Sequence, residues 1–389
     1  MRGVRSLWVT LALAACSAGE TGPTAVDGGT GDSAPREVAA PVDLSRMDPC
    51  VATGTCPPGV WTNVTPPGMA PADLRPAPNA FGPGTIVGDP ARPIDLYVGG
   101  SKSGLWKSSD YGNGWTKINS QIPDVARGAV IAVAGTTPAT LWAAGYNTVL
   151  KSTDGGMTFR QTSIGVSLYS IVVDPGDPDH LISGLHEADG IVESRDGGAT
   201  WRTVGGAGFP AGGVSWYPFF LRAGDPASTR RTWFAIAQGG GSPVITGDGG
   251  ATWTVPQGLR GLQHPHGNAQ IYQNGATIFV AGTSGPGQGV YRSTDMGLTF
   301  ARVDSGQAPQ AVVWGTPKNV YAMYAWACSN CNLGTQFEIA PQPGVTWSKG
   351  TVPPALVIGP NSLVVTSDGT RQIFVGLMWD QGLWRYVEP

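Results

Sequence analysis

One short polar motif occurs five times along the chain at nearly even spacing, and this periodicity limits the folds that the chain can adopt. In each copy a Ser or Thr is followed at alternate positions by Asp and Gly, and an aromatic residue closes the motif. The Asp-to-Asp spacings are 44, 42, 52 and 47 residues, and a degenerate sixth copy, "APQPGVTW", follows after a further 47. A period of this length is typical of β-propeller blades with four strands each. The aspartates of the five copies are Asp110, Asp154, Asp196, Asp248 and Asp295.

The residue types of the motif predict a hairpin turn and not a catalytic site. Alternating segments such as "GVYRS" precede the motif, and segments such as "FARVD" follow it, so each copy lies between two expected strands. A short Asp side chain accepts backbone N–H groups within a turn, and Gly supplies a positive φ. The Ser and Thr hydroxyls bond to nearby backbone, and the aromatic residue fills space against the neighbouring blade. We therefore expect a structural role for all five aspartates.

The motif resembles the Asp-box, also called the bacterial neuraminidase repeat. This repeat is found in sialidases, xyloglucan hydrolases, sortilin-type receptors and a photosystem II assembly factor. The resemblance covers roughly residues 60 to 389 and implies an all-β propeller of four-stranded blades joined by Asp-box hairpins. Because these families differ in what they do, the resemblance predicts the fold and leaves the function open.

The ends of the chain predict seven blades, with the propeller domain spanning residues 59–389. The C-terminal region contains three expected strands, near 363–366, 372–376 and 382–386, but no motif follows them. The segment "GVWTNVTP", residues 59 to 66, resembles a strand that follows a motif, and Trp61 takes the place of the aromatic residue. This N-terminal strand is expected to complete the last blade, close the ring and remove an exposed sheet edge. The alternative is six blades with an irregular tail.

The N-terminus has the pattern of an export signal. Arg2 and Arg5 precede the apolar stretch 7–15, which is too short to span a bilayer. It ends in Leu-Ala-Ala-Cys at Cys16, which resembles the lipobox of bacterial lipoproteins, in which the Cys is lipidated. We expect a lipoprotein signal over 1–16, with an ordinary secretory signal as the alternative. The implied location is the bacterial outer membrane or cell surface, with a lipid anchor as the only membrane contact.

Residues 17–58 are expected to form a disordered tether, since they are rich in Gly, Pro, Ser and Thr and have no hydrophobic period. Charged residues make up 13% of the chain, the formal net charge is −3, and no basic run is present. Nucleic acid is therefore not an expected partner. We expect a monomer without a cofactor or a bound metal.

Four further cysteines lie close together in two pairs, Cys50 with Cys56 and Cys328 with Cys331. An exported chain enters an oxidising compartment, so two local disulfides, Cys50–Cys56 and Cys328–Cys331, are expected. A zinc site built from all four and a redox-active Cys-x-x-Cys are the alternatives.

Ligands of propeller proteins usually bind on the face opposite the motif turns, near the ring axis. Expected strand starts and loops on that face carry aromatic, basic, amide and histidine side chains that suit a carbohydrate. The expected ligand-binding residues are Arg127, Tyr169, Trp216, Tyr217, His186, His264, Asn268, Trp326 and Trp379. The alternative is that they border a solvent-filled channel.

Cleavage of a glycan needs either two carboxylates on opposite sides of the scissile bond or a suitable acid–base pair. The expected catalytic candidates on this face are His266, Glu187, Asp189 and Asp380. A metal site formed by His186, His264 and His266 is an alternative use of those histidines. His180, in "GDPDH", is expected to be a surface turn residue.

Two functions of different class remain open. The first is a glycan-binding or glycan-cleaving envelope lipoprotein, which as an enzyme would be a glycoside hydrolase or a polysaccharide lyase. The second is a non-catalytic propeller that binds or assembles a protein partner. A sialidase is disfavoured, because the stretch "DLRPAP" lacks the aromatic and Ile of the motif that precedes the first Asp-box in that family.

Overall fold

In this computed structural model the described residues are 48–69, 84–100, 104–119, 130–145, 147–263, 271–282, 289–304, 311–324, 336–357, 359–378 and 381–389. All of them belong to one compact unit, Val42–Pro389. Within these residues no helix is long and apolar enough to cross a membrane.

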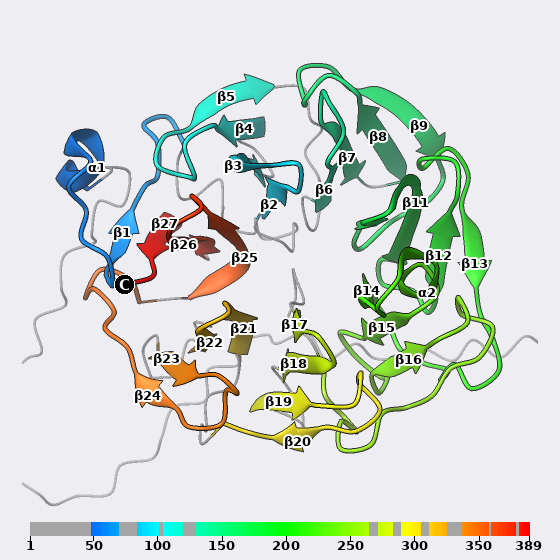
Figure 1. The fold of residues 1–389 in the computed structure, drawn as a ribbon. Coiled ribbons are helices and arrows are strands. Elements are labelled where there is room, and N and C mark those ends of the chain that lie inside the picture. The colour runs from blue at the N-terminus through cyan, green and yellow to red at the C-terminus, as the bar shows by residue number, and fades with distance from the viewer. Residues whose placement is uncertain are drawn as a thin grey trace, which may run out of the picture. The chain divides into compact units, whose positions relative to one another are not determined.

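Seven antiparallel sheets surround a central axis and form the ring drawn in Figure 1. This confirms the predicted seven-bladed β-propeller. Blade 1 consists of β2 (Thr85–Asp89), β3 (Arg92–Gly100), β4 (Gly104–Ser108) and β5 (Thr116–Asn119). Blade 2 consists of β6 (Val130–Ala134), β7 (Thr140–Gly145), β8 (Thr148–Ser152) and β9 (Arg160–Ile164). Blade 3 consists of β10 (Val172–Asp174), β11 (Asp177–Gly184), β12 (Ile191–Ser194) and β13 (Arg202–Val204). Blades 4 and 5 consist of β14 (Tyr217–Phe220), β15 (Trp233–Ile236) and β16 (Val244–Thr246), and of β17 (Ile271–Asn274), β18 (Thr277–Gly282), β19 (Gly289–Ser293) and β20 (Ala301–Arg302). Blade 6 consists of β21 (Ala311–Gly315), β22 (Asn319–Tyr324), β23 (Gln336–Pro341) and β24 (Ser348–Lys349), and blade 7 of β25 (Pro360–Ser367), β26 (Gln372–Met378), β27 (Gly382–Val387) and β1 (Trp61–Asn63).

The N-terminal strand completes the last blade, as predicted. β1 pairs antiparallel with β27, and Trp61 lies opposite Tyr386. The indole of Trp61 is 1% exposed, and its centroid lies 5.7 Å from that of Phe337 in blade 6. Blade 7 is thus made from both ends of the described chain, which Figure 1 shows as a blue strand beside a red one.

Blade 4 differs from the other six, because its sheet has three strands. At the position of a fourth strand, a single isolated bridge joins Ile245 to Thr254. The segment between blades 3 and 4 also pairs in parallel with this region through Ala207 and Thr252. A Cβ on Gly206 would lie 2.2 Å from the Ala251 carbonyl oxygen, so this close approach requires glycine.

The five motif copies form equivalent turns between the third and fourth strand positions of their blades. In each, the Ser or Thr hydroxyl donates to the aspartate Oδ1 over 2.7–2.8 Å. The same hydroxyl oxygen accepts the N–H of the motif glycine, whose φ lies between +80° and +90° in every copy. These bonds account for the spacing of the polar residues, and we call these segments the repeat turns.

The hydrophobic core lies between neighbouring blades. Each repeat-turn glycine abuts the preceding blade; a Cβ on Gly156, for example, would lie 2.6 Å from Leu105. The largest aromatic cluster joins blades 6 and 7 and includes Trp314, Tyr321, Phe337 and Phe374. Burial of these rings supplies a large part of the hydrophobic stabilisation at the closure of the ring.

The end of the expected tether belongs to the folded unit. Helix α1 (Pro49–Thr53) buries Val51 in the same core cluster as blades 1 and 7. The Cys50–Cys56 disulfide is present, and Asp48 Oδ2 accepts the N–H of Asn63 in β1. Residues 48–56 therefore pack beside the closing strand. The one other short helix within the described ranges, α2 (Pro226–Thr229), lies between β14 and β15 and is capped by Asp225.

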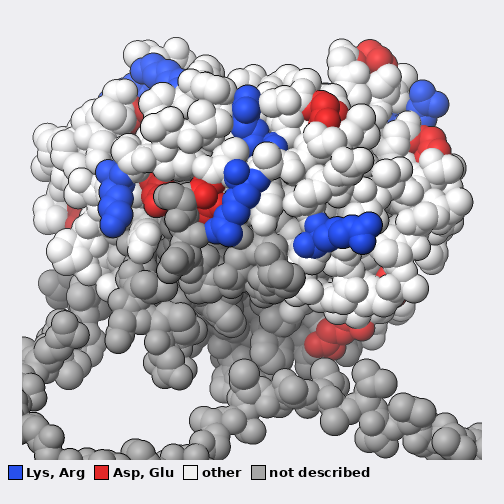
Figure 2. All heavy atoms as spheres, turned by 90° about the horizontal axis from the view of Figure 1, so that it is seen from below, with Lys and Arg blue, Asp and Glu red and all other residues white. Residues whose placement is uncertain are grey.

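Charged side chains are sparse and dispersed. Figure 2 shows basic and acidic groups scattered singly or in small mixed groups over the side of the molecule in view. This agrees with the low charged fraction of 13% in the sequence.

Candidate functional site

The two ends of the blades carry different loops. In the five blades that carry the motif, the repeat turn connects the third strand position to the fourth. The turn between the second and third strands and the connection to the next blade therefore lie at the other end of the blade. The structure describes three such segments around blades 3 and 4, at 165–171, 185–190 and 205–216. Six of the predicted site residues lie in or next to these segments: Tyr169, His186, Glu187, Asp189, Trp216 and Tyr217.

The turn between β11 and β12 presents Glu187 to solvent. Its side chain is 55% exposed, and its backbone has a φ of +51°, which is uncommon for a residue with a Cβ. The N–H of Glu187 donates to Ser215 Oγ over 3.0 Å, and the N–H of Ser215 donates to the Ala188 carbonyl over 3.3 Å. Two bonds between segments from adjacent blades therefore hold this unusual backbone in place.

Asp189 lies in the same turn and connects it to the segment before β14. Its Oδ2 accepts the N–H of Gly212 over 2.9 Å, and its Oδ1 accepts the indole N–H of Trp216 over 3.1 Å. Trp216 is fully buried beneath the turn, where its ring lies 4.9 Å from that of Phe209. In this arrangement Trp216 packs beneath the loop and supports it.

His186 and Tyr169 form the inner border of this area. The two ring centroids lie 5.9 Å apart, and His186 Nδ1 lies 3.9 Å from Glu187 Oε2. Tyr169 is 3% exposed and the His186 side chain 7% exposed, so both are mostly covered. We call the group of Tyr169, His186, Glu187, Asp189 and Trp216 the Glu187 shelf.

Close contact between blades fixes the position of the Glu187 shelf. A Cβ on Gly184, the last residue of β11, would lie 1.7 Å from the Trp216 carbonyl oxygen. The N–H of Tyr169 also donates to the Gly184 carbonyl over 2.8 Å. Gly184 thus allows the segments that carry Tyr169 and Trp216 to approach the base of the turn, which places the exposed carboxylates beside them.

Tyr217 lies apart from the shelf, on the wall of the axial channel. The channel has a volume of about 480 Å³ and is lined by residues of all seven innermost strands, mostly Ile, Val and aromatic side chains. The rings of Tyr217 and Phe219 stack with their centroids 5.1 Å apart. Burial raises the pKa of Tyr217 to about 12, so its hydroxyl remains protonated and able to donate at neutral pH.

His180 is not a surface turn residue, and that prediction is wrong. It lies in β11, 1% exposed, with Nδ1 2.8 Å from Asp174 Oδ2 and Nε2 2.8 Å from Glu193 Oε1. An imidazole donates from both nitrogens only when it is protonated. The ring also lies 5.0 Å from that of Phe220 in blade 4, in an edge-to-face arrangement.

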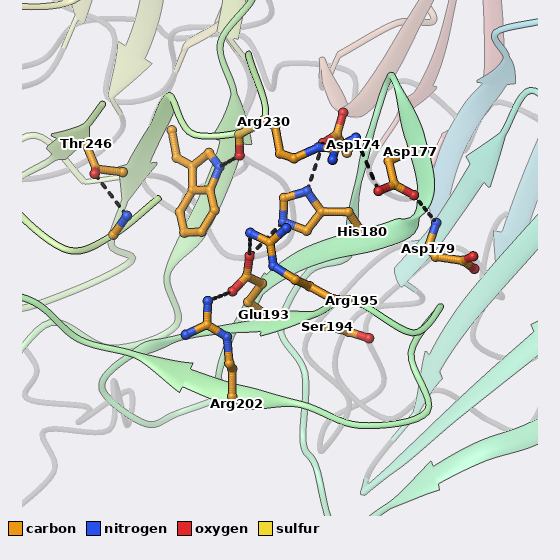
Figure 3. A network of polar contacts seen from close by, with 12 residues as sticks. Asp174, Asp177, Asp179, His180, Glu193, Ser194, Arg195, Arg202, Arg230 and Thr246 are labelled. Atoms are coloured by element: carbon orange, nitrogen blue, oxygen red, sulfur yellow. Dashed lines mark hydrogen bonds and ion pairs between the residues drawn. The ribbon is translucent and has the colours of Figure 1, made fainter. Parts of the chain in front are cut away.

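Three arginines complete this buried network, which Figure 3 shows. Arg195 and Arg202 both contact Glu193, and Arg230, which follows α2 in blade 4, lies 3.3 Å from Asp174. Burial raises the pKa of Glu193, but the hydrogen bond from His180 and the charges of the two arginines outweigh it and hold that pKa below its usual value. The network links blade 3 to blade 4 through Arg230 and Asp174, and its histidine and two carboxylates are buried and paired with one another, which indicates a structural role.

The sequence contains one signal for this network that our prediction missed. The residue before the repeat-turn Ser or Thr is Lys107, Lys151, Ile245 or Arg292 in the other four copies, and it is an acid only at Glu193. An acidic residue at a strand position that is basic in three of the other copies indicates a cationic partner at the blade interface. His180 and the arginines could have been sought on that basis.

The other predicted site residues lie outside the described residues. They are Arg127, His264, His266, Asn268, Trp326, Trp379 and Asp380, and the same holds for Cys16 and the Cys328–Cys331 pair. Among the residues that are described, no group of three or more His, Cys, Asp or Glu side chains is placed to hold a metal ion.

Seven sheets around one axis, closed by strands from both ends of the described chain, define a seven-bladed β-propeller. The chain belongs to the family of the DUF6242 beta propeller domain, which matches residues 94–333.

Curated relatives are xyloglucanases. The chain is 28% identical over 197 residues to a xyloglucanase from Paenibacillus sp., covering 47% of this chain and 16% of that protein. It is 27% identical over 175 residues to xyloglucanase Xgh74A from Acetivibrio thermocellus, covering 38% of this chain and 20% of the relative. The matched part is therefore a small fraction of these much longer proteins.

Solved structures support the fold. The GH74 xyloglucanase from Xanthomonas campestris superposes with a TM-score of 0.61 at 17% identity, covering 80% of this chain and 52% of that one. YCF48 from Cyanidioschyzon merolae superposes with a TM-score of 0.52 at 16% identity, covering 85% of this chain and 99% of that one. The propeller thus superposes on about half of the xyloglucanase chain and on nearly all of the YCF48 chain.

Proposed function

We propose that this protein is an exported, lipid-anchored glycan-binding propeller, and that the Glu187 shelf is part of its binding face. The observation that carries the proposal is the exposed Glu187 carboxylate, held by bonds from two blades in a backbone conformation that costs free energy. Strained residues persist where the surrounding structure fixes them, and they cluster at functional sites. The similarity to xyloglucanases supports a glycan as the ligand.

The shelf suits the hydroxyl groups of a sugar. Glu187 and Asp189 offer acceptors to sugar hydroxyls on an exposed turn, and charge-assisted hydrogen bonds are stronger than neutral ones. The nearby His186 adds a ring nitrogen at the inner border. The proposed face is completed by residues that were predicted from the sequence: Arg127, Tyr217, His264, His266, Asn268, Trp326, Trp379 and Asp380.

Binding is better supported than cleavage. Both Asp189 oxygens already accept hydrogen bonds from the protein. Glycoside hydrolysis needs two carboxylates with separate roles on opposite sides of the bond. Within the described residues, Glu187 and Asp189 lie in one turn and do not meet this requirement, so a hydrolytic role rests on His266 or Asp380.

A polysaccharide panel tests the proposal. The purified chain from residue 48 onward is run through native gels containing xyloglucan, hydroxyethyl cellulose, pectin or no polymer, and each incubation is assayed for new reducing ends and for absorbance at 235 nm. We expect retardation by at least one polymer, reduced in Glu187→Gln and unchanged in Asp179→Asn at the opposite end of β11. Absence of retardation by every polymer would exclude the glycan-binding role, and new reducing ends that require His266 or Asp380 would show cleavage.

The anchor has its own test. We propose that Cys16 is lipidated after export, as its resemblance to a lipobox implies. Incorporation of labelled palmitate into the full chain, and its loss in Cys16→Ser, is the expected result. Labelling that persists in Cys16→Ser, or no labelling of the wild type, would contradict the anchor without affecting the glycan proposal.

A further inference from the structure

We propose that the axial channel is a second binding site, which takes an extended peptide segment with its terminal carboxylate on Arg222. This site lies on the ring axis, and its ligand belongs to a different class from the glycan proposed for the shelf. The proposal therefore does not depend on the Glu187 shelf.

The wall of the channel consists of sheet edges. β2, β6, β10, β14, β17, β21 and β25 are the first strands of their blades and contribute residues to the lining. Within the described residues, each of them pairs with one neighbour, the second strand of its own blade. Its other edge faces the axis, as Figure 1 shows. Unpaired N–H and C=O groups on a strand edge are a template for pairing with a further strand.

The side chains of the wall fit a peptide as well. Val87, Val172 and Val364 are only half-buried and leave apolar surface facing the channel. The N–H and C=O of Ile86 in β2 are bonded to the Ser362 hydroxyl of β25. A lipid chain would cover the apolar surface but would form no hydrogen bonds with the remaining groups of the strand edges. An added strand matches both the strand edges and the apolar side chains of the wall, since it supplies amide groups at the same spacing and side chains on alternate sides.

β25 is the best-suited edge. It spans Pro360–Ser367, eight residues, whereas the other innermost strands span three to five. Ser362, Leu363, Val364 and Val365 all line the channel. A paired segment of six residues would extend about 20 Å along the axis. The channel volume of about 480 Å³ lies within the usual range of ligand pockets.

A pocket of about 410 Å³ adjoins the channel at the ends of the innermost strands. Val133 and Val173 line both spaces. The pocket also includes Pro90, which directly follows β2, Asp174, which ends β10, and Arg222, which lies two residues after the end of β14. All these strands run toward the pocket. A ligand that ends here with its own C-terminus would therefore lie parallel to them.

Arg222 supplies the charge that a terminal carboxylate requires. Its backbone is held by Gln273 of blade 5 through two bonds of 2.9 Å, while its side chain is exposed at the pocket. Among the described residues, no ion pair is formed by its guanidinium. Asp174 on the same wall is already paired with His180 and Arg230, as Figure 3 shows, so it does not cancel the charge of Arg222.

Fluorescence polarisation with synthetic peptides tests the proposal. The probe is a labelled hexapeptide pool with Val or Thr at every position, made once with a free carboxylate and once with a C-terminal amide. We expect the carboxylate pool to bind wild type at least tenfold more tightly than the amide pool. Arg222→Gln should abolish this difference, Arg222→Lys should retain part of it, and Arg160→Gln, an exposed arginine in β9, should leave it unchanged.

Two further measurements keep the result specific to the channel. Peptide binding should slow hydrogen exchange of backbone amides in β25, and excess hydroxyethyl cellulose should not displace the peptide. The proposal is overturned if folded wild type binds neither pool, if it binds acid and amide equally, or if Arg222→Gln binds as wild type does. Displacement by the polysaccharide would also overturn it, because the peptide would then occupy the shelf.

Discussion

His180 Nε2 lies 2.8 Å from Glu193 Oε1, and this contact joins two neighbouring strands of blade 3 at a point where both side chains are about 1% exposed. Removal of one partner from a buried ion pair leaves an uncompensated charge and costs about 3–5 kcal/mol. We predict that His180→Ala lowers the free energy of unfolding by about 3 kcal/mol, near the lower end of that range because Arg195 and Arg202 still contact Glu193. Urea unfolding followed by tryptophan fluorescence measures the change.

Lys151→Ala is the matched control for that variant, because Lys151 occupies the same motif position in blade 2 as Glu193 in blade 3. It pairs with the exposed Asp179 at 3.5 Å, and surface pairs of this kind contribute about 0–1 kcal/mol. A loss in His180→Ala no larger than the loss in Lys151→Ala would contradict a structural role for the network.

The repeat turns predict a defined acid sensitivity. Hydrogen bonds from the Thr158 hydroxyl and N–H lower the pKa of Asp154 to about 2, and equivalent bonds do the same for Asp248 and Asp295. A carboxylate with a lowered folded pKa stabilises the fold above its unfolded pKa, near 3.8, and loses that contribution as the pH falls toward 2.

The triple variant Asp154→Asn, Asp248→Asn, Asp295→Asn measures this contribution. We predict a Tm below that of wild type between pH 5 and 7, with a gap that narrows from about pH 4 downward and closes near pH 2. Differential scanning calorimetry at a series of pH values follows the gap. A Tm difference that stays constant over the whole pH series would mean that the stabilisation by these carboxylates does not depend on their charge.

Local sequence was sufficient to predict the repeat turns, because their bonds join residues two to four positions apart, such as Ser152, Asp154 and Gly156. The closing strand was also predictable, since Trp61 repeats the aromatic position of the motif. The His180 network was not, because Asp174 and Glu193 meet His180 only when β10, β11 and β12 pair, and Arg230 reaches Asp174 only after blade 4 packs against blade 3. Trp216 was predicted as a ligand-binding aromatic, and no feature of the sequence indicates that its ring is buried with its indole N–H bound to Asp189.

Gly184→Ala is predicted to disrupt the shelf. Its Cβ would lie 1.7 Å from the Trp216 carbonyl oxygen, so the segment before β14 must move. We expect a lower Tm and a loss of glycan retardation in native gels. Gly205→Ala provides the control, since no atom lies within 4 Å of the added Cβ. Retained retardation in a destabilised Gly184→Ala protein would show that the ligand does not contact the shelf.

Closure of the ring depends on Trp61. The side chain is 1% exposed and contacts aromatic residues of blades 6 and 7. Truncation of a buried Trp costs about 3–5 kcal/mol, so Trp61→Ala should lower the urea midpoint strongly. Val60→Ala, at a neighbouring side chain that is 39% exposed, should change it little. Equal midpoints for Trp61→Ala and wild type would show that β1 does not stabilise the closed ring.

The affinity of the shelf for its glycan tests the central claim most directly. Isothermal titration calorimetry is performed on wild type, Glu187→Gln and Asp179→Asn with the polymer that retards the protein most. We predict binding to wild type, affinity about tenfold weaker in Glu187→Gln, which corresponds to about 1.4 kcal/mol, and unchanged affinity in Asp179→Asn. Equal affinity of wild type and Glu187→Gln, both correctly folded, would contradict the assignment of this shelf as the glycan-binding site.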